Sequence, residues 1–215
     1  MKVKKYPQSH LLITNDSGKK LIIDPGYLTY EKGFKVSDFQ GADVYLITHQ
    51  HLDHLDINTI KEIVGENPVY CNADVVSKLA EVGVKANEVT NRQKFSVAGF
   101  EIVAVDIPHF EVPGKEVPQN TGYLIDGIFF HPGDGGEAPN HLHSDNLALL
   151  IANPWISPGH YGKAIEFAKA LEAKLVIPIH YDSRYPADTK EFKEKASDAG
   201  LEVRVLGWGE ETTIH

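Results

Sequence analysis

The sequence predicts an α/β protein built as a four-layer αβ/βα sandwich. First, its pattern runs in two successive halves, each beginning with the apolar alternation of β hairpins and ending with helix–strand units. Second, 215 residues, 42% of them hydrophobic, suffice for one well-buried core but not for two ordinary domains and a linker. Two sheets packed face to face, with helices outside, would bury such a chain. We therefore expect residues 1–215 to form a single domain.

The first half is predicted to contain four strands and two helices. The strands cover residues 11–14, 20–24, 44–48 and 69–71. The third strand is a continuous apolar run, which is typical of a strand buried on both faces. Residues 57–64 have helical spacing after Asp56, a capping residue, and a second helix runs from the cap Asn72 to about residue 82 before Gly83. We expect residues 27–35 to form a polar loop.

The second half is predicted to contain a β meander followed by helix–strand units. The strands cover residues 95–97, 100–105, 123–125, 128–130, 147–151, 174–177 and 203–205. Gly99 and Gly127 mark tight turns, and residues 110–119 form a loop rich in proline and charge. Amphipathic spacing over residues 161–173 and 189–199 predicts two helices.

Composition excludes several classes of function. The net charge is −9 and the lysines are scattered, so binding of nucleic acid by a basic surface has no support. We find no apolar stretch near the roughly 20 residues that a membrane span needs, and no apolar signal core at the N-terminus. We therefore expect a cytoplasmic protein. Cys71 is the single cysteine, which rules out an intrachain disulfide and a cage of thiolate ligands.

The stretch from His49 to His54 is the strongest chemical signal in the sequence. It places three imidazoles and one carboxylate within six residues, directly after the apolar run of residues 44–47. These groups suit Zn²⁺, Fe, Mn or Ni. Since residues two apart in an extended segment point the same way, His49 and His51 can hold one ion together. Asp53 and His54 follow where the chain turns, and can face a second ion.

Ligand-type residues recur just beyond three further apolar runs. His109 follows residues 103–108, Asp134 follows residues 128–133, and His180 follows residues 175–179. Strand ends are suitable places for side chains that must converge in space. The recurrence of this arrangement four times therefore predicts a metal site more strongly than any one case does.

With these residues, the chain resembles the metallo-β-lactamase superfamily. The matching residues are Thr48-His49-Gln50-His51-Leu52-Asp53-His54, His109, Gly133-Asp134 and His180. The early Ile23-Asp24-Pro25 and the late Ile177-Pro178-Ile179-His180-Tyr181 resemble one branch of it, the ascorbate-6-phosphate lactonase-like and N-acyl phosphatidylethanolamine phospholipase D-like hydrolases. The resemblance implies a metallo-β-lactamase-like sandwich with a dinuclear site. It places His49, His51 and His109 on the first ion, Asp53, His54 and His180 on the second, and Asp134 between them.

That arrangement implies a metal-dependent hydrolase. Two divalent ions, expected to be Zn²⁺ although Mn, Fe and Ni also fit, would activate water against an ester-like or phosphoester bond of a small-molecule substrate. Asp53 would also act as the general base. The resemblance favours a lactone or a phosphodiester as substrate. Gly135 and Gly136 depart from the Thr or Ser that many relatives carry after the bridging aspartate, which would either loosen the support of Asp134 or leave room for substrate.

Alternatives remain open at this point. A non-catalytic, metal-dependent binding protein or sensor could use the same fold. A β-lactamase, a glyoxalase II-like thioesterase, a β-CASP nuclease and a flavin-coupled di-iron enzyme are disfavoured, because the features that accompany them are absent from the sequence. We expect His131 to pack near the site without binding metal, His141 and His143 to lie on the surface, and Asp24 to orient a ligand. Aromatic and basic residues near the site could line a pocket: Tyr27, Tyr30, Phe110, Tyr181, Arg184 and Tyr185.

Overall fold

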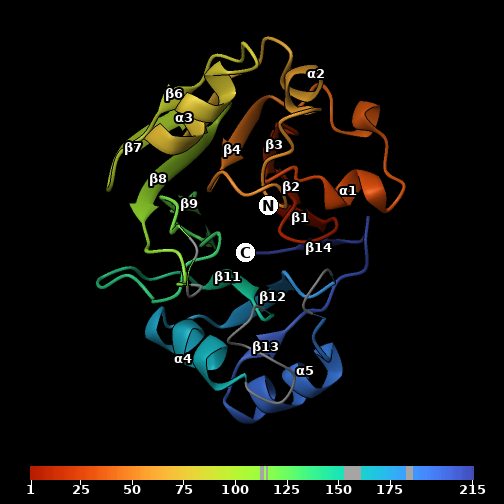
Figure 1. Ribbon diagram of the computed structural model, residues 1–215. Helices are drawn as coiled ribbons and strands as arrows, with labels where there is room; N and C mark the ends of the chain where they lie inside the picture. The colour runs from red at the N-terminus through yellow and green to blue at the C-terminus, as the bar shows by residue number, and fades with distance from the viewer. Residues whose placement is uncertain (112–113, 115, 153–160, 183–185) are drawn as a thin grey trace.

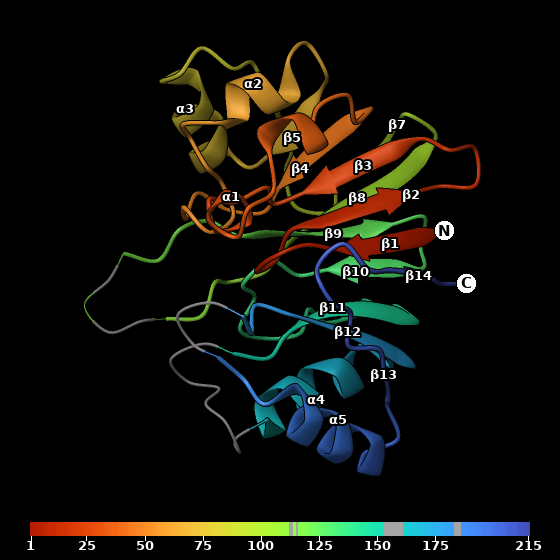
Figure 2. The same ribbon diagram turned by 90° about the vertical axis from the view of Figure 1, so that its right-hand side faces the viewer.

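Two seven-stranded mixed sheets pack face to face in the computed structural model, and helices cover their outer faces (Figures 1 and 2). The structure describes residues 1–111, 114, 116–152, 161–182 and 186–215. This arrangement confirms the predicted αβ/βα sandwich. The two sheets have the same internal plan, because each joins antiparallel strands on one side to parallel strands on the other.

The first sheet has the order β14-β1-β2-β3-β4-β5-β6. Its strands are β1 (Lys2–Lys5), β2 (Leu11–Thr14), β3 (Lys20–Ile23), β4 (Val44–Ile47), β5 (Val69–Cys71), β6 (Asn87–Glu88) and β14 (Glu211–Thr213). The second sheet has the order β13-β12-β11-β10-β9-β8-β7. Its strands are β7 (Lys94–Val97), β8 (Phe100–Asp106), β9 (Thr121–Ile125), β10 (Phe129–His131), β11 (Asn146–Leu150), β12 (Leu175–Ile179) and β13 (Glu202–Val203).

The helices lie in two outer layers, as Figure 2 shows. They are α1 (Leu28–Glu31), the 3₁₀ helix η1 (Val36–Asp38), α2 (Ile60–Val64), α3 (Ala73–Ala80), α4 (Gly162–Ala170) and α5 (Thr189–Asp198). The second and third α-helices pack on the first sheet, and the last two on the second sheet. The predicted cap Asn72 is present, since its side chain accepts a hydrogen bond from the Val75 N–H at 3.2 Å and begins α3.

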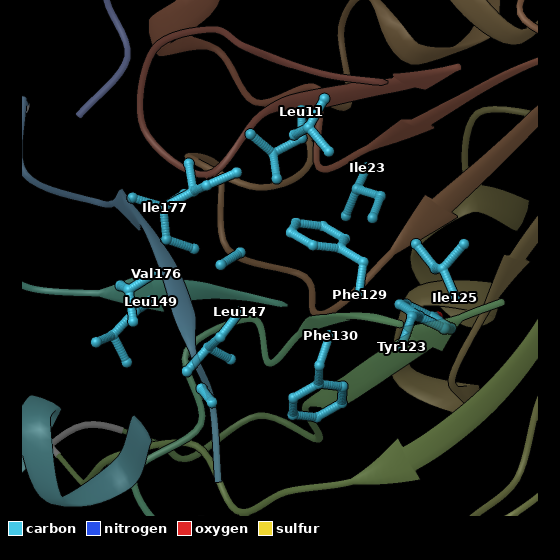
Figure 3. Packing of buried hydrophobic residues seen from close by; sticks show 14 of the residues in the cluster. Leu11, Ile23, Tyr123, Ile125, Phe129, Phe130, Leu147, Leu149, Val176 and Ile177 are labelled. Atoms are coloured by element: carbon cyan, nitrogen blue, oxygen red, sulfur yellow. The ribbon is translucent and has the colours of Figure 1, made fainter. Parts of the chain in front are cut away.

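Strand β4 shows how alternation builds the layers. All of its residues are buried, but Val44 and Leu46 join the core between the sheets, whereas Tyr45 and Ile47 join the core beneath α2 and α3. Figure 3 shows Leu11 of the first sheet in the layer that also holds Phe129 of the second. The two sheets therefore share one continuous apolar core, which fixes the relative position of their loops.

Some local predictions were wrong. The expected loop over residues 27–35 contains α1, and β1, β6 and β14 were not predicted. Asp56 does not cap a helix directly, because its carboxylate accepts hydrogen bonds from the Asn58 N–H and the Thr59 hydroxyl in the turn before α2. The strand expected to end at Pro178 continues to Ile179. Pro178 is tolerated within it because β13 pairs only with the first two residues of β12.

The ends of several strands meet at one edge of the sandwich. Strands β3 to β6 are parallel, so their carboxyl ends lie together, and β10 to β13 share the same property in the second sheet. Hydrogen bonds tie the two edges together, because Thr48 O accepts from the Thr121 N–H at 3.0 Å and from the Asn72 side chain at 2.9 Å. The loops that follow these strands carry the candidate site.

Candidate metal centre

Seven histidine and aspartate side chains converge where the loops of the two sheets meet. Three overlapping groups have ligand atoms within 4.8 Å of one another: His49, His51 and His109; His49, His54 and Asp134; and Asp53, His54 and His180. All seven residues predicted from the sequence are therefore brought together. Five of them are buried, while His51 and Asp53 are partly exposed.

The first group consists of imidazoles. His49 Nε2 lies 3.1 Å from His51 Nδ1, and the His49 and His109 ring centroids are 4.8 Å apart. His49 Nδ1 contacts the Thr48 hydroxyl at 3.1 Å, and His109 Nδ1 donates to Phe110 O at 2.7 Å. These partners leave the opposite nitrogen, Nε2, of His49 and His109 to face the centre. His49 and His51 converge within the loop after β4 rather than along an extended strand, which is not the geometry expected.

The second group mixes carboxylate and imidazole. His180 Nε2 lies 3.2 Å from Asp53 Oδ2, and His54 Nε2 lies 3.9 Å from the same oxygen. His180 Nδ1 donates to Ala152 O at 2.7 Å, so its Nε2 is directed inward. The Asp53 side chain is 27% exposed, against 5% for His180, which makes Asp53 the accessible member of this group.

Asp134 lies between the two groups. Its Oδ1 is 3.2 Å from His54 Nε2, while its Oδ2 is 3.6 Å from His109 Nε2 and 3.4 Å from His180 Nε2. One carboxylate therefore faces imidazoles of both groups with its two oxygens. This is the position that a ligand shared by two ions would occupy.

The site contains buried polar atoms whose close polar neighbours belong to the site itself. His54 Nε2 and Asp134 Oδ1 face each other at 3.2 Å, and His109 Nε2 lies 3.6 Å from Asp134 Oδ2, but none of the three buried atoms has a well-formed hydrogen bond within the described part of the chain. Leaving such atoms unpaired typically costs about 1–3 kcal/mol each. Imidazole nitrogens and carboxylate oxygens aimed at a common point are the donor set of a divalent transition metal. The side chains present thus fit a metal site by chemistry as well as by position.

Asp24 orients His54. It follows β3, is fully buried, and adopts a backbone φ of 51°. Its carboxylate accepts hydrogen bonds from the Thr48 N–H at 2.8 Å, the Thr48 hydroxyl at 2.7 Å and His54 Nδ1 at 2.7 Å. The bond to His54 places the ring proton on Nδ1 and leaves Nε2 free for a metal. Asp24 therefore has the orienting role expected of it.

Gly26 completes this support, because a Cβ there would lie 1.9 Å from the Asp53 carbonyl oxygen. The next residue, Tyr27, donates its backbone N–H to Leu52 O at 3.0 Å. The segment after β3 thus packs directly against the backbone of the His49–His54 loop. Only glycine permits that approach.

The loops that carry His109 and Asp134 are joined to each other. Phe110 N donates to Asp134 O at 3.1 Å, and Gly136 N donates to Pro108 O at 3.0 Å. A Cβ on Gly135 would lie 2.5 Å from Ile107 Cγ2, and one on Gly136 would lie 3.2 Å from Phe110 Cα. The two glycines therefore neither loosen the loop nor open space for substrate, since close packing of the loops takes up that space.

The charges differ between the two groups. Burial lowers the pKa of His49 well below its ordinary value, and burial also lowers the pKa of His51 and of His109. Burial acts the same way on His54 and His180, but nearby carboxylates, Asp134 first, outweigh it and raise the pKa of both. The surroundings therefore favour the neutral form of the imidazoles in the first group, whereas the carboxylates favour the protonated form of His54 and His180, and a bound cation would take the place of those protons.

The carboxylates show the converse effect. Burial raises the pKa of Asp53 and of Asp134, yet the neighbouring histidines outweigh it and hold each pKa below the ordinary value. For Asp53 these are His54 and His180, and for Asp134 they are His180, His54 and His109. Both side chains are therefore ionised at neutral pH and can bind cations.

Other histidines lie apart from the convergent set. His131 is buried, with Nε2 3.1 Å from Ser9 O and Nδ1 accepting from the Gly133 N–H at 3.2 Å, so it shapes the turn before Asp134 as expected. His143 is exposed beside Asp145 and Glu172. His141 is exposed in a loop.

Of the residues considered as a pocket lining, Tyr27 is 36% exposed beside the site, and Phe110 packs against His109 with ring centroids 4.5 Å apart. Tyr181 is partly buried against the core between the sheets, and its hydroxyl donates to Leu206 O at 3.0 Å. Tyr30 packs against Phe39, with ring centroids 6.1 Å apart. Arg184 and Tyr185 lie outside the described residues. One residue in contact with the site, Gln8, was not predicted, since a glutamine before a strand carries no ligand signal.

Comparison with known proteins shows the family of the chain. The model of the "Beta-lactamase superfamily domain" matches residues 2–180. The chain belongs to this superfamily. It is 32% identical over 225 aligned positions to the "UPF0173 metal-dependent hydrolase" of Pyrococcus abyssi, a match that covers 95% of this chain and 96% of that protein. The chain thus belongs to this family of metal-dependent hydrolases.

Solved structures support the fold. Igni18, described as a novel metallo hydrolase from Ignicoccus hospitalis, superposes with a TM-score of 0.73 and 26% identity over 100% of this chain and 98% of that one. YhfI of Bacillus subtilis, a metallo-β-lactamase fold protein, superposes with a TM-score of 0.70 and 15% identity over 98% of each chain, and this likeness concerns the fold alone. The resemblance to one particular branch of hydrolases stays a prediction. We found no helix among the described residues that is long and apolar enough to cross a membrane.

Proposed function

We propose that the chain uses a dinuclear metal centre to activate water against an ester-like or phosphoester bond of a small substrate, a lactone or a phosphodiester. His49, His51 and His109 would hold the first ion, and Asp53, His54 and His180 the second. Asp134 would bridge the two. When bound, two divalent ions lower the pKa of water toward about 7 and stabilise charge on the attacked group.

The observation that carries the proposal is the placement of Asp134. Its two oxygens lie 3.2 to 3.6 Å from imidazole nitrogens of both groups, and Oδ1 and two of these nitrogens are buried without hydrogen bonds among the described residues. A single ion would leave part of this set unpaired, and leaving buried polar groups unpaired is costly. Two ions would satisfy all of it.

Asp53 is the side chain best placed to take a proton. Its carboxylate is 27% exposed, whereas that of Asp134 is 3% exposed, so substrate and water can reach Asp53. Its Oδ2 is held by Gln8 Nε2 at 2.9 Å and lies 3.2 Å from His180 Nε2. The other oxygen, Oδ1, remains for the general-base role.

The entrance to the site also has an apolar side. Leu52, between His51 and Asp53, is 58% exposed, and Tyr27, whose backbone is bonded to it, is 36% exposed. Exposed apolar side chains next to a polar centre favour a substrate with a carbon skeleton beside the bond that is cut. This supports a small organic ester, lactone or phosphodiester rather than a fully ionic substrate.

Metal analysis and hydrolysis test the proposal together. The wild-type protein should carry two equivalents of a divalent metal and hydrolyse at least one member of a panel of p-nitrophenyl esters, bis(p-nitrophenyl) phosphate and simple lactones in the presence of Zn²⁺, Mn²⁺ or Fe²⁺. His109→Ala and Asp134→Ala should each reduce metal content and turnover by at least 100-fold in rate. His143→Ala, at an exposed histidine, should change neither.

Wild-type protein that binds fewer than two equivalents of metal, or full activity in Asp134→Ala, would refute the dinuclear mechanism. Tight binding of two ions with no turnover of any probe would instead favour the non-catalytic sensor. Zn²⁺ as the native ion and a cytoplasmic location are proposed on composition and ligand type alone. That residues 1–215 act as a single domain without nucleic acid is likewise a proposal, supported by the core the sheets share.

A further inference from the structure

Gln8 occupies an unusual position at the edge of the candidate metal centre. It lies in the turn between β1 and β2, is 1% exposed, and has a backbone φ of 63°. A residue other than glycine, asparagine or aspartate seldom adopts this conformation, because its Cβ makes the conformation unfavourable. The surrounding structure must therefore hold Gln8 in place.

The backbone of Gln8 is fixed by the segment that carries His180. Its N–H donates to Asp182 Oδ1 at 2.9 Å, and its carbonyl accepts from the His180 N–H at 3.1 Å. Asp182 is itself held by the Lys5 ammonium at 3.0 Å, and the Lys5 side chain is fully buried. The backbone of Gln8 is therefore bonded directly to the segment that carries His180.

The side chain of Gln8 reaches the candidate ligand Asp53. Its Nε2 donates to Asp53 Oδ2 at 2.9 Å, the oxygen that lies 3.2 Å from His180 Nε2. The amide must face Asp53 with its nitrogen, because its oxygen would place two acceptors together. Gln8 thus contacts both Asp53 and His180, and these two contact each other, so the three residues form a closed ring at the second group.

The oxygen of the Gln8 amide contributes nothing to the stability of the folded protein. Its Oε1 is buried and forms no hydrogen bond within the described residues. A methionine would fill the same space without a buried, unpaired acceptor, which is destabilising. The presence of glutamine is thus best explained by its N–H donor.

We propose that Gln8 is a positioning residue of the metal centre: its amide N–H fixes Asp53 Oδ2 so that the carboxylate can hold the ion shared with His54 and His180. This inference rests on the proposed function, since it assigns Gln8 to the second ion only. Outer contacts of this kind typically change metal affinity or activity by about 10–100-fold when they are removed.

Two variants separate this role from a role in shaping the turn. Gln8→Asn keeps the amide and suits a positive φ, but it is one methylene too short to reach Asp53. Gln8→Met keeps the length and removes the N–H. Gln40→Met makes the same chemical change at an exposed loop residue, where the amide bonds Glu62 O at 3.1 Å, and serves as the control.

Titration of the metal-free protein with Co²⁺, followed by its visible absorption, reports each equivalent without a substrate. In both Gln8 variants we expect the second equivalent to bind 10–100-fold more weakly and the first, at the three imidazoles, to bind as in the wild type. With any hydrolysed probe, kcat should fall by a similar factor while KM changes less than about threefold. Gln40→Met should match the wild type throughout.

The outcomes are distinguishable. If the wild type binds two equivalents and both Gln8 variants bind the second equally well, the role of Gln8 is refuted while the proposed function stands. If Gln8→Asn behaves as wild type and only Gln8→Met is impaired, Gln8 shapes the turn and the proposal is also overturned. If the wild type takes up no second equivalent, the dinuclear proposal fails, and the role of Gln8 fails with it. Should Gln8→Met not fold, the Gln8→Asn result decides.

Discussion

Replacing Asp24 by asparagine removes one charge and leaves the shape of the side chain unchanged. Asparagine tolerates the backbone φ of 51° at this position, so the backbone itself should not be strained. The Asp24 carboxylate faces three donors, namely the Thr48 N–H, the Thr48 hydroxyl and His54 Nδ1. An amide supplies one oxygen and one NH₂ group, so it cannot accept from all three.

Each orientation of the new amide has a definite consequence. If the NH₂ group faces the Thr48 N–H, two donors meet inside the core. If it faces His54, the imidazole must move its proton from Nδ1 to Nε2, the atom directed at the candidate ion. The first case leaves a buried donor unpaired for about 1–3 kcal/mol, and the loss of charge weakens the remaining bonds. We expect a total destabilisation of about 2–4 kcal/mol, or a 10–100-fold loss of metal affinity, or some of each.

Urea unfolding of the metal-free protein and Co²⁺ titration measure the two consequences separately. Asp126→Asn is the matched control, because Asp126 also has a positive φ of 52° but accepts a single exposed hydrogen bond from the Glu101 N–H at 2.8 Å. It should change stability by less than about 1 kcal/mol. An Asp24→Asn protein with both the stability and the metal affinity of the wild type would show that Asp24 does not set the His54 tautomer.

Three further predictions concern the loops, a buried histidine and the metal. Gly135→Ala should destabilise the protein by about 1–3 kcal/mol in urea unfolding, because a Cβ there would lie 2.5 Å from Ile107 Cγ2, whereas Gly162→Ala, with nothing within 4 Å, should be neutral or stabilising. Burial lowers the pKa of His10 to about 3. As the pH falls below about 6.5, His10 is therefore protonated in the unfolded chain but stays neutral in the folded protein. Between pH 7 and pH 4.5 the wild type should therefore lose about 2–3 kcal/mol more stability than His10→Asn, and equal losses would contradict this. Removing metal with a chelator should lower the free energy of unfolding by about 3 kcal/mol when the free ion is near 100 times its Kd, and an unchanged melting temperature would contradict metal binding by the native state.

The candidate ligands could be predicted from the sequence because they follow recognisable apolar runs. His49, His109, Asp134 and His180 come shortly after β4, β8, β10 and β12, and the packing of two sheets brings those strand ends to one edge. The alternation that predicts the strands thus also predicts where the loops meet. The recurrence of ligand-type residues after strands thus predicted a metal site, while the assignment of the seven ligands to two ions came from the resemblance to the superfamily.

Contacts made by residues without such a signal could not be predicted. Strand β14 has the sequence Glu-Thr-Thr and forms because it pairs with β1, nearly the whole chain away. Lys5 is fully buried against Asp182, although lysine is ordinarily exposed, and only the fold brings the two together. Gln8 depends on the same segment through Asp182 and His180. A local pattern cannot reveal a partner that lies more than 170 residues away.

The two halves of the centre differ in what must be assembled before they can bind metal. The three imidazoles of the first group need only the loop after β4 and the loop after β8. The His49 ring is oriented by the neighbouring Thr48, and the His109 ring by the neighbouring Phe110. The second group needs Asp24 after β3, His180 after β12 and Gln8 before β2, so it draws on both ends of the chain. Both groups need the two sheets packed together, but only the second also depends on the turn between β1 and β2. Substitutions at Gln8 and Asp24 should accordingly weaken binding of the second ion before that of the first. Partial unfolding of the sheet edge formed by β1 and β14 should release the second ion while the first stays bound.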